Sequence, residues 1–226
     1  MSKPTHRTKA SDNGTNRLLL GGAVFVVVLA VVAATFFDGS GDGRSGEEAA
    51  ARQVALASEH APTVGEPDAK VHIVEFLDPA CGTCALFYPM VKGWMAEVPG
   101  QIRLSVRHVT FHEGVDYAVK VLEASRNQDR YWQTLEALLA NQRQWVHNHV
   151  VQPDRVGPVI AGVGLDMAQL QADMNSAEVL RRIEKDRQDA VTLKVSATPE
   201  YFVNGRQLPS FGQDQLAALV REELRK

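Results

Sequence analysis

The sequence predicts an α/β fold, and three observations lead to this expectation. A short apolar run rich in β-branched residues, 71–77, precedes a segment with helical spacing. A block of helical patterns fills about 114–193, and a hairpin pattern at 200–208 precedes an amphipathic C-terminal helix. Short strands alternating with helices are typical of a sheet that helices cover.

The first strand is expected at Val71–Leu77, because a continuous apolar run of this length is typical of a strand buried on both faces. A helix is expected from Gly82 to about Val98, and Pro89 inside it predicts a kink. Four apolar side chains are expected to share its buried face: Leu86, Met90, Val91 and Trp94.

The folded domain is expected over residues 65–226, and the rest of its strands and helices are predicted from the same kinds of pattern. "IRLSVRHV" at Ile102–Val109 alternates as a second strand, and five segments within 114–193 show helix spacing. Asn204-Gly205 between two short strands is a strong hairpin signal. The order β-α-β, helical block, β-β-α predicts a thioredoxin fold with a helical insertion.

The N-terminal part predicts a membrane anchor. Leu18–Phe37 is twenty residues without a charge, which as a helix spans roughly 30 Å, the thickness of a bilayer core. Residues 1–17 carry a formal charge of +3 and the remainder −6, within a net charge of −3. The positive-inside rule therefore places 1–17 in the cytoplasm and the rest outside it. A cleaved signal peptide, whose apolar core is usually about 7–15 residues, is the competing interpretation and exports the domain equally.

Residues 38–64 are expected to form a linker. "DGSGDGRSG" is flexible, and "EEAAARQVALASEH" contains strong helix formers with only a thin apolar stripe. A solvated tether is favoured over a helical stalk or a dimer contact. The acidic body, without a clustered basic face, argues against nucleic acid as a partner.

The only two cysteines, Cys81 and Cys84, stand three positions apart where the first strand gives way to a helix. In an exported protein cysteines tend to oxidise, but a bridge across so short a loop constrains the chain very little. The free N–H groups of a helix start lower the pKa of the first thiol, which makes Cys81 the attacking thiolate and Cys84 the resolving thiol. A zinc site completed by His147 and His149, which point apart at this spacing on a helix, and a passive disulfide are the alternatives.

Two distant segments carry a family resemblance. "EPDAKVHIVEFLDPACGTCALFYP" and "SATPEYFVNGRQL" together resemble the DsbA-like family of exported thioredoxin-fold thiol–disulfide oxidoreductases, over about 65–226. The resemblance makes Pro199 a cis-proline facing the disulfide, and it makes the backbone of Thr198 a contact for extended substrate. A trans proline that starts a strand is the alternative for Pro199. Expected partners are cysteine-containing exported proteins and a redox partner that resets the disulfide, and no cofactor or metal is needed.

Glu75 lies in the apolar strand, where the resembling family also carries a buried acid. A buried carboxyl has a raised pKa and could exchange a proton with Cys84. The alternative is a partly exposed residue paired with a lysine or His72.

The expected function is a disulfide oxidase anchored by a single membrane span. The resemblance implies that this membrane is the cytoplasmic (inner) membrane and that the catalytic domain is on the periplasmic side. Gly82-Thr83 between the cysteines departs from the Pro-His of the strongest oxidants of the family, so isomerase and reductase stay open. Glu200 departs from the small residue that many relatives carry, which leaves substrate preference open. The rival is a tethered chaperone or a carrier of Cu(I), which favours soft thiolate ligands.

Overall fold

The computed structural model describes residues 46–57 and 59–226. The chain divides into two compact units, 1–50 and 51–226, and the described residues of the first, 46–50, are helical. The tail at 1–17 and the anchor expected at 18–37 lie outside the described residues. Within the part that is described, no helix combines the length and apolar character needed to cross a bilayer.

A five-stranded sheet with the order β1-β3-β2-β6-β7 forms the centre of the second unit. The strands are β1 (Thr63–Val64), β2 (Val71–Leu77), β3 (Ile102–His108), β6 (Glu200–Val203) and β7 (Arg206–Gln207). β2 and β3 run parallel, and the other neighbours are antiparallel. Asn204 and Gly205 have φ angles of 48° and 79°, so the β6–β7 hairpin has the two positive φ angles of a type I′ turn.

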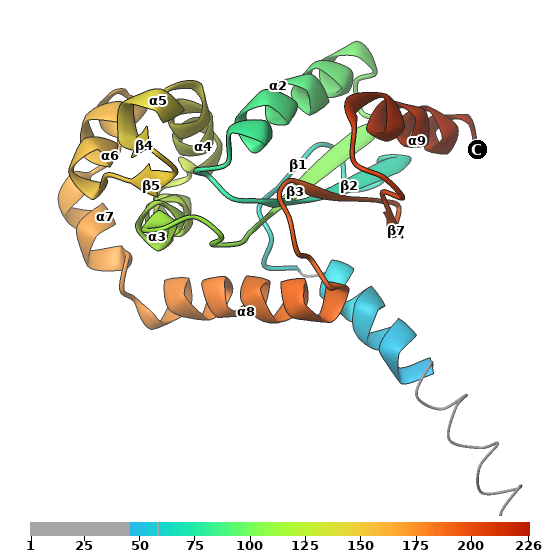
Figure 1. Cartoon of the computed structure of the whole chain (residues 1–226), viewed down its shortest axis with the longest axis horizontal. Coiled ribbons are helices and arrows are strands. Elements are labelled where there is room, and N and C mark those ends of the chain that lie inside the picture. The colour runs from blue at the N-terminus through green and yellow to red at the C-terminus, as the bar shows by residue number, and fades with distance from the viewer. Residues whose placement is uncertain (1–45, 58) are drawn as a thin grey trace, which may run out of the picture. The chain divides into compact units, whose positions relative to one another are not determined.

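Helices cover both faces of this sheet. α2 and α9 lie on one face and α8 on the other, while α3, α4, α5, α6 and α7 gather at one end (Figure 1). Their bounds are α2 (Gly82–Glu97), α3 (Val115–Ser125), α4 (Tyr131–Ala140), α5 (Gln142–Trp145), α6 (Pro153–Ile160), α7 (Met167–Asp173), α8 (Ala177–Leu193) and α9 (Gln213–Arg225). A small hairpin of β4 (Val146–His147) and β5 (Val150–Val151) interrupts the helical block. The predicted thioredoxin fold with a helical insertion is therefore confirmed.

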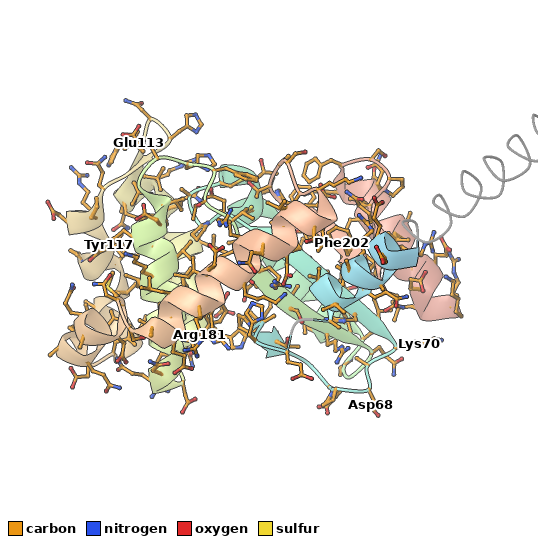
Figure 2. All side chains as sticks on the ribbon, turned by 90° about the horizontal axis from the view of Figure 1, so that it is seen from below. Asp68, Lys70, Glu113, Tyr117, Arg181 and Phe202 are labelled. Atoms are coloured by element: carbon orange, nitrogen blue, oxygen red, sulfur yellow. The ribbon has the colours of Figure 1, made fainter. Side chains whose placement is uncertain are left out.

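Because both faces are covered, the central strands are buried on both sides. Ile73 and Leu77 of β2 belong to the larger core cluster, which includes residues of α2, α9 and the insertion. Phe76 and Phe202 belong to a smaller cluster with Leu193 of α8. Figure 2 shows α8 crossing in front of the strands, with Phe202 beside it.

The folded unit begins before residue 65. Thr63–Val64 pairs antiparallel with β3 as the edge strand β1, and Ala55 is buried in the smaller cluster. Residues 46–56 are helical. Part of the segment expected as a solvated tether at 38–64 is thus built into the sheet and its core.

Three local expectations were wrong. Leu86 is 61% exposed, because the buried face of α2 is set by the i, i+3, i+4, i+7 series that starts at Cys84. β3 is buried on both faces rather than on alternate residues. His147 and His149 are not on a helix: the former is in β4, and the latter has a φ of 65° in the turn that follows.

Candidate active site

The two cysteines lie at the start of α2. Cys81 is the N-cap residue, and its Sγ accepts a hydrogen bond from the backbone N–H of Cys84 at 3.5 Å. Both are free thiols, with Cys81 7% exposed and Cys84 fully buried. An N-cap side chain accepts from the otherwise unpaired N–H groups of the first turn, so this position favours a negatively charged sulfur.

The surroundings separate the acidities of the two thiols. A hydrogen bond from the Cys84 side chain lowers the pKa of Cys81 to about 5, against burial, with further help from Thr198 and the N–H groups of Cys84 and Thr83. Burial raises the pKa of Cys84 far above its ordinary value, and its hydrogen bond to Cys81 and the charge of Glu75 act in the same direction. At neutral pH the reduced site therefore holds a thiolate at Cys81 and a thiol at Cys84.

A loop from the other end of the chain faces this pair. The Thr198–Pro199 peptide bond is cis, which confirms that expectation. The Sγ of Cys81 lies 3.4 Å from the carbonyl oxygen of Thr198, to which the protonated thiol can donate, and β6 begins directly after Pro199. The structure thus brings together the two segments that carry the family resemblance.

Glu75 is fully buried in β2, so the partly exposed alternative is wrong. Its Oε1 accepts a hydrogen bond from the Tyr201 hydroxyl at 3.0 Å, while His72 bonds Ser105 and Arg103 instead. Burial raises the pKa of Glu75 to about 8; the hydrogen bond from Tyr201 opposes this shift and the charge of Cys81 adds to it. A carboxyl with this pKa can give or take a proton near neutral pH.

Sequence reasoning missed the residues that hold the loop before Cys81. Buried Asp78 accepts from the N–H of Ala80 at 2.8 Å through Oδ1, and from the N–H groups of Phe111 and His112 at 2.8 and 3.0 Å through Oδ2. Gln142 of α5 donates to the carbonyl oxygen of Pro79 at 2.9 Å. An Asp directly before Pro, at the end of a strand, is a turn signal that could have identified Asp78. Nothing local could have identified Gln142.

The histidines considered as zinc ligands have other neighbours. Nε2 of His147 is hydrogen-bonded to Arg155 at 2.9 Å, and the ring of His149 stacks on His112 with centroids 5.8 Å apart. Across 46–57 and 59–226, no group of three or more His, Cys, Asp or Glu side chains is arranged to hold a metal ion.

Comparisons with protein families and with solved structures identify relatives of this chain. A family model described as thioredoxin matches residues 57–222, which is most of the chain. The chain belongs to the thioredoxin family. A solved structure of a thioredoxin-like oxidoreductase from Silicibacter pomeroyi DSS-3 is 30% identical with a TM-score of 0.66, covering 76% of this chain and 98% of that one. Together with the disulfide bond formation protein described below, these matches confirm the resemblance to the DsbA-like family of thiol–disulfide oxidoreductases.

Two relatives differ in how much of their length is matched. A probable disulfide bond formation protein D of Bacillus anthracis is 26% identical over 222 residues, 94% of this chain and 99% of the relative. The Na(+)/H(+) antiporter NhaA of Herminiimonas arsenicoxydans is 30% identical over 72% of this chain, but the match spans only 25% of the antiporter. This thioredoxin-family chain thus corresponds to one part of some relatives and to nearly the whole of others.

Proposed function

We propose that this protein is a membrane-anchored, extracytoplasmic thiol–disulfide oxidoreductase that passes disulfides to exported proteins. The observation that carries the proposal is the pairing of a slightly exposed Cys81, with its pKa lowered to about 5 by its hydrogen bond from Cys84, with a fully buried Cys84. Such a pair offers a substrate one reactive sulfur and protects the other.

In the proposed reaction a substrate thiolate attacks Sγ of Cys81 in the Cys81–Cys84 disulfide. A substrate–Cys81 disulfide forms, and the sulfur of Cys84 leaves as a thiolate that takes a proton from Glu75. A second substrate thiolate then attacks the substrate sulfur of this mixed disulfide and releases Cys81 as a thiolate. Two electrons pass from the substrate dithiol to the protein, which a disulfide of a redox partner must later reoxidise.

The direction of exchange follows from the acidity of Cys81. A thiol of low pKa is a good leaving group, and a stabilised thiolate favours the reduced form of the protein. A protein whose reduced form is stabilised is an oxidant. This favours the oxidase over the isomerase or reductase, although Gly82-Thr83 replaces the dipeptide of the strongest oxidants.

Substrate contact is proposed at the loop that faces Cys81. A cavity of about 330 Å³ is lined by residues 197–201 and 207–211. Phe211 at its rim is 55% exposed and stacks on Phe87 of α2 at 4.9 Å. The backbone of Thr198 beside Pro199 would pair with an extended peptide, and the apolar rim would hold its side chains.

The remaining expectations complete the proposal. Residues 1–17 would be cytoplasmic, Leu18–Phe37 would span the inner membrane, and the folded domain would lie in the periplasm. The charge asymmetry and length of the apolar run support this orientation. The proposed redox partner is a membrane or exported protein that supplies a disulfide to the reduced Cys81–Cys84 pair.

The test is the equilibrium reduction potential of the Cys81–Cys84 pair in the full-length protein, measured in glutathione buffers. A value toward about −120 mV supports the oxidase, and one near about −270 mV would make the protein a reductase. Replacing Cys81 by Ser should abolish exchange, whereas Cys84→Ser should accumulate adducts with substrate. If no reversible disulfide forms, the catalytic proposal fails and the tethered chaperone or copper carrier replaces it.

A further inference from the structure

The site contains a buried hydroxyl that the reaction above does not use. Tyr201 lies in β6, two residues after Pro199, and is the register partner of Glu75 across the β2–β6 pair. Both side chains are fully buried. The ring of Tyr201 stacks on Phe87 of α2, with centroids 6.2 Å apart, which fixes the position of the hydroxyl.

The two oxygens of Glu75 have different surroundings. Oε1 accepts the hydrogen bond from Tyr201 at 3.0 Å, whereas Oε2 is buried without a hydrogen-bond partner. In a protonated carboxyl group the carbonyl oxygen is the stronger hydrogen-bond acceptor, and the other oxygen carries the proton. With Oε1 as the carbonyl oxygen, the acidic proton of Glu75 is on Oε2.

The titratable neighbours of Glu75 place this proton in the redox site. Its charge interacts with Cys84, Cys81 and Tyr88 of α2 and with Tyr201 of β6. Its parallel register partner in β3 is the apolar Val106. Tyr88 donates to Glu136 at 3.2 Å. Among the described residues this leaves the sulfurs as the nearby groups that change protonation during exchange.

We propose that Tyr201 is a positioning residue, which holds Glu75 so that the oxygen facing away from Tyr201 carries the proton delivered to Cys84. This rests on the proposed exchange reaction and deepens it. When a substrate thiolate opens the disulfide, the bond between the two protein sulfurs breaks and the electron pair stays on Cys84. The proton then moves from Oε2 to Cys84, and Oε1 keeps its hydrogen bond from Tyr201 as the carboxylate forms.

The test is a double-mutant cycle on the oxidised full-length protein reacting with dithiothreitol across the pH range. The wild-type rate, corrected for ionisation of dithiothreitol, should fall as Glu75 loses its proton, at a pH that burial raises above the ordinary value of a carboxyl group. Tyr201→Phe should reduce the rate at neutral pH by roughly two- to tenfold, the equivalent of one hydrogen bond, and move the midpoint to higher pH. Glu75→Gln should abolish the midpoint, and adding Tyr201→Phe to it should cause no further loss.

Tyr131→Phe is the matched control, because Tyr131, in α4 of the insertion, is also buried but bonds His108 at the end of β3. It should leave the pH profile unchanged. The inference is overturned if Tyr201→Phe has the wild-type profile, or if it slows the Glu75→Gln variant as much as it slows the wild type.

A second measurement, on the wild-type protein, tests the inference even if the Tyr201→Phe variant does not fold. In the wild-type protein, carbon-13 NMR signals of the Glu75 carboxyl and the Tyr201 ring carbon bearing the hydroxyl should titrate with one midpoint. Independent midpoints would overturn the inference. Failure of the proposed function is a separate outcome. If the Cys81→Ser variant still exchanges disulfides, the proposed function fails, whereas the shared titration of Glu75 and Tyr201 can still be observed.

Discussion

The Sγ of Cys81 lies 3.4 Å from the carbonyl oxygen of Thr198, which is more than a hundred residues away in the chain. The hydrogen bond from the Cys84 side chain lowers the pKa of Cys81 most, and burial opposes this shift. A hydrogen bond with the Thr198 side chain lowers the pKa further. The loop before Pro199 therefore stabilises the reactive thiolate, in addition to its proposed role of offering backbone to a substrate.

The first prediction concerns this contact. Thr198→Val should raise the pKa of Cys81 above its wild-type value of about 5, because one of the hydrogen bonds that lower it is removed. The pH dependence of thiolate ultraviolet absorbance in the reduced protein measures this. Thr192→Val is the control, since that hydroxyl is on α8 and bonds the carbonyl oxygen of Gln188. An unchanged midpoint in Thr198→Val would contradict the assignment.

The second prediction is a pH dependence of stability in the reduced state. Folding lowers the pKa of Cys81 from about 9 to about 5, chiefly through the hydrogen bond from Cys84, so the unfolded chain binds more protons between these values. The free energy of unfolding contributed by Cys81 should therefore rise from pH 5 to pH 9, be complete above about 9, and be lost below about 5. Chemical denaturation of the wild type and Cys81→Ser, both reduced, measures the difference. A difference that falls with rising pH would be inconsistent with a stabilised thiolate.

The third prediction concerns the link between the insertion and the active-site loop. Gln142→Ala removes the donor to the buried carbonyl oxygen of Pro79 and should lower the free energy of unfolding by about 1–3 kcal/mol. Gln144→Ala is the matched control, because it loses only an exposed bond to Asn141 and should change stability by less than about 0.5 kcal/mol. Equal effects of the two variants in urea denaturation would show that the Pro79 contact does not stabilise the fold.

The fourth prediction concerns a buried ion cluster on the α8 side of the sheet. Arg107 of β3 pairs with Asp186 and Asp189 of α8 and donates to the carbonyl oxygen of Ala55 at 2.9 Å. Arg107→Ala should destabilise the protein by about 3–5 kcal/mol, since it leaves buried carboxylates without this cation. Thermal denaturation compares it with Arg187→Ala, whose solvent-exposed pair with Glu184 should contribute little to stability. Similar melting temperatures for the two variants would rule out a structural role for the cluster.

Several elements were predictable because their signals are local. The continuous apolar run gave β2 its observed bounds, Val71–Leu77, and Asn204-Gly205 placed the turn of the β6–β7 hairpin. Cys81 at a strand-to-helix junction was expected at a helix start and is its N-cap. In each case the signal is contained within a few consecutive residues.

Other features could not be predicted because they depend on distant partners. Leu86 is apolar, as core residues are, but the face of α2 that packs on the sheet leaves its side chain exposed to solvent. The hydrogen bond between Tyr201 and Glu75 joins residues 126 positions apart, and only the β2–β6 register makes them neighbours.

The sequence by itself determined the order of the main strands and helices, the two-cysteine motif at a helix start, and the resemblance that led to Pro199. Only the tertiary structure decided which groups surround Cys81 and Cys84, and therefore how acidic each of them is. The physical reason is that a pKa depends on burial and on the charges and hydrogen-bond donors within a few ångströms. Folding sets these surroundings by packing β6, β2 and α2 together.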